Sequence, residues 1–99
     1  MEMKKIENGN FCFNDLLYFD DLNIQIILKK IEIPLLAKAL KDSSKEMQEK
    51  FFHNMKELDV SMLKEDIEWF ENIQKSDVKN AQEEIKKIIL QLDEKGEIQ

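Results

Sequence analysis

The stretch SDVKNAQEEIKKIILQLDEKG, residues 76–96, decides the fold class of this 99-residue chain. Its apolar residues recur at the spacing of one helix face over about four turns. They are Val78, Ala81, Ile85, Ile88, Ile89 and Leu92. Ser76 can cap the start of this helix, and Gly96 stands where helices often end in the left-handed conformation. The stretch therefore predicts a long amphipathic helix whose apolar face must be covered by neighbouring elements.

The first half of the chain predicts three short helical segments, of which the first is a turn around residues 15–19. Asp20 and Asp21 can then cap a helix with one buried stripe. That stripe consists of Ile24, Ile27, Leu28 and Ile31. Pro34 suits the first turn of the next helix, because its missing N–H is not needed there. The apolar residues of this third segment are Leu36, Ala37, Ala39 and Leu40.

Two further helices are predicted before residue 76. Ser43 and Glu46 have the spacing of a capping box, which opens a helix. Its apolar face is Met47, Phe51 and Met55. Residues 57–70 form the other helix, and its core-facing residues are Val60, Leu63, Ile67 and Phe70. Since two glycines and one proline are too few for a β-sandwich or barrel, the sequence predicts a compact all-α domain of six helices.

One hydrophobic core is expected, because 99 residues leave no room for a second. It should contain Ile24, Leu28, Phe51, Leu63, Ile67, Ile85 and Ile88. Residues 1–10 are polar and hold Asn8-Gly9-Asn10, so we expect a flexible lead-in to a domain over residues 11–98. Phe11 and Phe13 are expected to anchor the start of that domain against the core.

The charge balance disfavours nucleic acid as a partner. Fifteen basic residues face 21 acidic ones, which gives a net charge of −6 and repels phosphate backbones. The longest apolar run, residues 33–37, is far too short to cross a membrane. Residues 1–5 carry charge without a following apolar segment, so no signal peptide is predicted. A single cysteine fits a reducing compartment, and we expect a cytoplasmic protein without membrane insertion.

Catalytic and metal-binding chemistry is not indicated. Cys12 and His53 are the only cysteine and histidine, and no third group marks a nucleophile pair or a zinc site. Cys12 is expected to pack as a small apolar residue. His53 should lie on a solvated helix edge near Glu49 and Glu57. We therefore expect no enzyme activity, no cofactor and no metal.

The predicted helix over residues 57–70 has large apolar groups on both faces. Leu58, Met62, Glu65 and Trp69 share one ridge, nearly opposite the core-facing residues. Two interpretations stay open. The ridge is a partner-binding surface, or Met62 and Trp69 pack against neighbouring helices as the edge of the core.

An ordered set of short motifs identifies a family resemblance. The set is Phe11-Cys12-Phe13, Asp20-Asp21 with Ile24-Gln25, LAKALK over residues 36–41, Asn54-Met55, Asp77-Val78 with Ala81-Gln82 and Ile85, and Gly96-Glu97-Ile98. With these motifs, residues 11–98 resemble the C-terminal six-helix domain of the flagellar rotor switch protein FliG.

This resemblance implies a right-handed helical superhelix with a charged helix that faces the stator protein MotA. Complementary charges would transmit torque there, at the inner face of the cell membrane in the flagellar basal body. The family's acidic pair corresponds to Glu65 and Asp66, and the lysine after its LA-x-AL pattern corresponds to Lys41. The implied partners are MotA and rotor proteins such as FliM.

The chain departs from the family at several positions. Leu58 stands at an arginine position, and Gln74 stands at the basic position before the last helix. Glu71-Asn72-Ile73 replaces Gly-Pro-Val, and Asn10 replaces the methionine of a Met-Phe-x-Phe hinge. The two charges that are lost, at Leu58 and Gln74, are both cationic in the family.

The first hypothesis is a non-enzymatic interaction domain of the rotor and switch complex that contacts the stator through a charged helix. The alternative is a stand-alone helical adaptor of the same fold. It would bind a different protein, or a second copy as a weak homodimer, through the apolar ridge. The candidate interaction residues are Lys41, Leu58, Met62, Glu65, Asp66 and Trp69.

Overall fold

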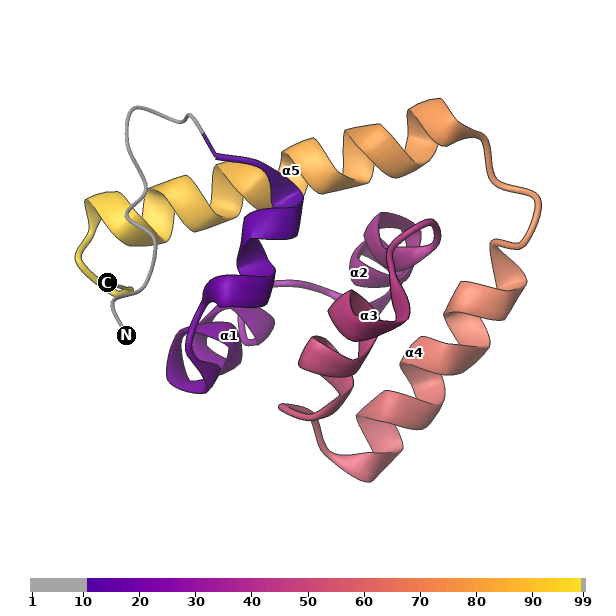
Figure 1. Ribbon diagram of the computed structural model, residues 1–99, viewed down its shortest axis with the longest axis horizontal. Helices are drawn as coiled ribbons and strands as arrows, with labels where there is room; N and C mark the ends of the chain where they lie inside the picture. Colours follow the sequence, from indigo (N-terminus) through magenta and orange to yellow (C-terminus); the bar gives the residue numbers. More distant parts are fainter. Residues whose placement is uncertain (1–10, 99) are drawn as a thin grey trace.

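The computed structural model describes residues 11–98, and every regular element in that range is helical. The predicted lead-in over residues 1–10, including the hinge position Asn10, lies outside the described residues. In chain order the elements are η1 (Phe13–Tyr18), α1 (Asp21–Leu28), α2 (Ile33–Leu40), α3 (Lys45–Phe52), α4 (Glu57–Trp69) and α5 (Lys75–Glu94) (Figure 1). The η1 element is a 3-10 helix. The predicted all-α fold of six helices is confirmed.

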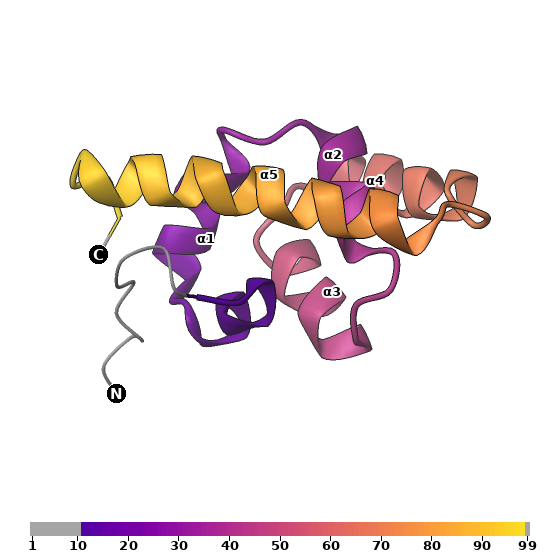
Figure 2. The same cartoon turned by 90° about the horizontal axis from the view of Figure 1, so that it is seen from above.

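Helix α2 lies at the centre of the domain and packs against both α4 and α5. Its Ala37 and Ala39 are fully buried, so neighbouring backbones can come close to it. Helix α5 runs along one edge and α4 along another, with α2 between them (Figure 1). Seen from above, α2 and α4 lie toward one side of α5, whereas η1 and α3 lie toward the other (Figure 2).

The predicted core is confirmed. Ile24, Phe51 and Leu63 are fully buried, as is Ile85. The other predicted members are partly buried against the same cluster. These are Leu28, Ile67 and Ile88.

The aromatic start of the domain is anchored as predicted, with one correction. Phe11 and Phe13 are buried, and the Phe11 ring stacks on Phe19 with centroids 6.4 Å apart. Cys12 is exposed, so the expectation that it packs as an apolar residue was wrong. Because both flanking phenylalanines are buried in the core, the short side chain between them is left on the surface.

Three predicted helix signals hold. Asp20 caps α1 by accepting a hydrogen bond from the Asn23 N–H at 2.8 Å, and Pro34 lies in the first turn of α2. At the end of α5, Gly96 has φ 72°, and its N–H donates to the Asp93 carbonyl at 3.0 Å. The next N–H, of Glu97, donates to the Leu92 carbonyl at 2.9 Å, which completes a Schellman motif.

Two predicted caps are displaced. Ser44 rather than Ser43 caps α3, since its hydroxyl accepts from the Met47 N–H at 3.2 Å. The Ser43 N–H donates to the Leu40 carbonyl and closes a turn that follows α2, so the extended cap residue is the next one, Ser44. Helix α5 starts from Gln74, whose carbonyl closes its first turn, so Ser76 lies inside the helix.

Two apolar residues assigned to helix stripes lie outside their helices. Helix α1 ends at Leu28 and α3 ends at Phe52. Ile31 and Met55 therefore pack against the core from the connecting turns.

Candidate interaction surface on helix α4

Helix α4 is held mainly from one side. It packs chiefly on α2 and forms an outer edge of the domain (Figure 1). Leu63 is its one buried residue, and Ile67 and Phe70 pack against the core beside it. The opposite side of the helix is open to solvent.

The predicted ridge lies on this open side. The exposed fractions are 72% for Leu58, 46% for Met62 and 83% for Trp69, and Glu65 is also exposed. Exposure of this extent excludes a place for these side chains at the edge of the core. Three large apolar groups on one face of one helix are typical of a surface that contacts another molecule.

Carboxylates surround the ridge. Glu65 interrupts it, Glu68 is exposed beside it, and Asp59 and Asp66 are half-buried toward the packed side of the helix. The lysine within α4, Lys64, places its Nζ 5.2 Å from the centre of the Phe52 ring on α3. That cation is thereby held at the α3 side of the helix.

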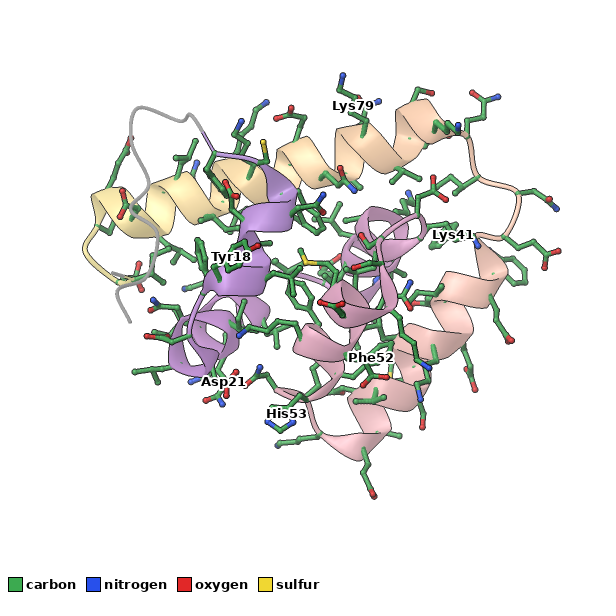
Figure 3. All side chains as sticks on the ribbon, in the orientation of Figure 1. Tyr18, Asp21, Lys41, Phe52, His53 and Lys79 are labelled. Carbon is green, nitrogen blue, oxygen red and sulfur yellow. The ribbon has the colours of Figure 1, made fainter. Side chains whose placement is uncertain are left out.

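Lys41 lies on a different element from the other five predicted residues. It is the half-buried C-cap of α2, and its N–H donates to the Lys38 carbonyl at 3.4 Å. Figure 3 shows it at the end of α2, on the side of the molecule that α4 forms. The structure thus gathers Leu58, Met62, Glu65, Asp66 and Trp69 on one helix, whereas Lys41 lies at the end of α2.

A polar network that the sequence did not indicate joins α1 to the turn after α3. The Asn54 side-chain amide donates to the Asp21 carboxylate at 3.1 Å and to the Lys50 carbonyl at 2.9 Å. Its own carbonyl oxygen accepts from Gln25 at 3.1 Å. The Asn54 hydrogen bond and the Lys50 ammonium, 3.6 Å away, lower the pKa of Asp21. His53 is exposed nearby, as predicted (Figure 3).

Asp21, Gln25 and Asn54 belong to two of the motifs that carry the family resemblance. Membership of these motifs was the signal by which the sequence could have marked the three residues. The contacts between them could not be predicted, because periodicity does not match partners that are 29 and 33 residues apart.

No group of three or more His, Cys, Asp or Glu side chains among residues 11–98 could hold a metal ion. None of the helices in this range is long and apolar enough to cross a membrane. An apolar surface groove of about 390 Å³ lies where α1, the start of α2 and the start of α4 meet. Leu28, Ile33 and Met55 are among the residues that line it.

An all-helical domain with an apolar ridge among carboxylates on its surface has the features typical of protein-interaction domains. A more particular assignment comes from comparison with known proteins. The chain belongs to the FliG C-terminal domain family, whose model matches residues 2–99. The match along the whole chain does not favour an adaptor of unrelated role.

Relatives and solved structures agree with this assignment. The chain is 41% identical over 95 residues to the flagellar motor switch protein FliG of Borreliella burgdorferi and 39% identical over 94 residues to that of Thermotoga maritima. These matches cover 96% and 95% of this chain and 28% of each relative. The crystal structure of FliG residues 86–343 from H. pylori superposes with a TM-score of 0.86 at 35% identity. That superposition covers 90% of this chain and 42% of the other.

Two predictions are settled by the family. The resemblance to the FliG C-terminal domain is confirmed, together with the all-α fold of six helices. The similar proteins are named as flagellar motor switch proteins, which agrees with the prediction that this domain is not an enzyme.

Proposed function

We propose that this chain acts in the rotor and switch complex of the bacterial flagellar motor, as the domain that contacts the stator through α4. One observation carries the proposal. The position of the family's acidic pair, Glu65 and Asp66, falls on a helix that is packed mainly from one side. Glu65 is exposed there, and Asp66 is half-buried beside it.

The charges suggest what each partner supplies. Glu65 and Asp66 attract cationic groups of the stator protein MotA, while Lys41 offers one cation at the end of α2. Leu58 replaces the family's arginine, and Gln74 replaces its second cation. The charged part of recognition through α4 therefore depends on the carboxylates. Rotor proteins such as FliM are the partners within the same complex, at the cytoplasmic face of the membrane.

The strength of such contacts suits a partner that passes and leaves. An exposed ion pair contributes about 0.2–1 kcal/mol and is screened by salt. A few such pairs form and break quickly, whereas a permanent complex needs extensive apolar burial.

The test is a Glu65→Lys, Asp66→Lys double variant expressed in motile cells in place of the native domain. Motility and recovery of MotA should fall strongly, because the attraction becomes repulsion. Thermal stability should stay within about 0.5 kcal/mol of the parent, as for most surface substitutions.

The matched control is Glu83→Lys, Glu84→Lys, which reverses an exposed acidic pair on α5 instead. It changes the net charge equally and should leave motility intact. Equal motility of the two double variants would show that α4 is not the stator-facing surface.

A further inference from the structure

The exposed side of α4 has the spacing of a coiled-coil seam. Leu58, Met62, Glu65 and Trp69 are separated by four, three and four residues, which is the alternation of d and a positions in a heptad. The seam spans roughly 17 Å, or about three helical turns. All four side chains are exposed, so the full length of the seam can accept a second helix.

The borders of this seam carry negative charge. Asp59 and Asp66 follow the seam residues on one side, Glu68 lies on the other, and Glu65 occupies the seam itself. Lys64 does not offset them along the seam, because its ammonium lies over the Phe52 ring.

We infer that the seam docks one amphipathic helix of a partner protein, in which lysines or arginines border an apolar stripe. This inference rests on the proposed function, since it describes the chemistry of the partner at the same helix. Trp69 is the natural anchor, because exposed tryptophans dominate binding where they become enclosed. Glu65 requires a cation opposite it, since an unpaired carboxylate inside an interface is strongly unfavourable.

A second copy of this chain does not meet these requirements. A two-fold contact places the same patch of each copy against the other. The carboxylates of Glu65, Asp66 and Glu68 would then face a seam with the same negative charge. Such juxtaposition of like charges disfavours the contact.

Two synthetic helical peptides of about four turns test the inference. Both carry the same leucine stripe, bordered by lysines in one and by glutamates in the other. Binding of labelled peptide to the 99-residue chain is followed by fluorescence anisotropy, and Trp69, the single tryptophan, reports enclosure by a blue shift. We expect the lysine-bordered peptide to bind at least about tenfold more tightly, with an advantage that shrinks as salt is added.

Leu58→Arg and Trp69→Ala should each weaken binding of the lysine-bordered peptide by about tenfold or more. Leu22→Arg is the matched control, because Leu22 on α1 is similarly exposed, at 66% against 72% for Leu58. It should leave binding unchanged, and all three variants should keep the helical circular dichroism of the parent.

Three results would overturn the inference. They are equal binding of both peptides, no binding of either, and self-association of the parent with enclosure of Trp69 and no peptide present. The proposed function is judged separately, by motility of the Glu65→Lys, Asp66→Lys variant. If motility stays intact and the peptides bind selectively, the stator role is wrong and the inference about the seam stands. If motility is lost and the peptides bind equally, the stator role stands and the inference about the seam is wrong.

Discussion

The two leucines of helix α4 differ in how far they are buried. Leu63 is fully buried where α4 packs against the core, whereas Leu58, little more than one turn earlier on the same helix, is 72% exposed. The two side chains have the same chemistry, so any difference in their contribution to stability comes from their surroundings. Removing buried methyl groups costs transfer free energy and leaves a cavity, while an exposed leucine has little to lose.

Leu63→Ala should therefore lower the free energy of unfolding by about 2–5 kcal/mol. Leu58→Ala, as the control, should change it by no more than about 0.5 kcal/mol. Urea denaturation of both variants, followed by circular dichroism, gives the two values. Similar losses at both positions would mean that the exposed side of α4 is structural.

Asp21 predicts a dependence of stability on acid. Its pKa is lowered in the folded chain, first by the Asn54 hydrogen bond and then by Lys50. A lowered carboxyl pKa gives stability that is present above the ordinary value of 3.8 and is lost as pH falls through the folded value. Asp21→Asn should therefore melt with a smaller decrease on acidification than the parent. Melting temperatures measured from neutral pH into the acid range check this, and parallel curves would argue against it.

At the scale of elements, the start of α4 shows how acidic residues take different roles. Lys56, its N-cap, makes no side-chain capping hydrogen bond, but Glu57 and Asp59 lie in the first turn. Carboxylates there are stabilised by the helix dipole. Glu65 and Asp66 lie beyond the reach of that effect, so their charge is free for recognition.

Helix α3 gives a matched test of the displaced cap. Ser44→Ala removes the hydroxyl that accepts from Met47 and should cost about 1 kcal/mol. Ser43→Ala should cost less, because the Ser43 hydroxyl makes only a long contact of 3.4 Å with the Ala39 carbonyl. Thermal unfolding of the two variants compares them directly, and the opposite order would restore Ser43 as the cap.

Helix existence and the core could be predicted from the sequence because period and composition are local. The stripe of α5 and Gly96 specify both its packed face and its end. The choice between adjacent serines could not be predicted, because it depends on where the previous helix finishes. Nor could the exposure of Trp69, because apolar groups on both faces of a helix fit a buried and a surface position equally well.

Across the whole molecule, the family motifs meet in pairs. The Gln82 side chain on α5 donates to the Ala39 carbonyl in α2 at 2.9 Å, which joins two motifs 43 residues apart. Asn54 joins two more through Asp21 and Gln25. The residues of these motifs therefore have a structural role in this chain, because their hydrogen bonds join helices that are far apart in the sequence.

The central position of α2 has a consequence for how the domain opens. Amides exchange with solvent through local unfolding, and segments with many buried neighbours open least often. Because α2 is enclosed by α4 and α5, its amides should exchange most slowly, close to the rate set by global unfolding. Those of α4 should exchange faster, and deuterium uptake by mass spectrometry would detect the order. Uniform uptake would show a domain that opens only as one unit. If the order is as expected, α4 can detach briefly while α2 stays folded. A mechanical force applied to α4 would then separate this helix before the rest of the domain unfolds.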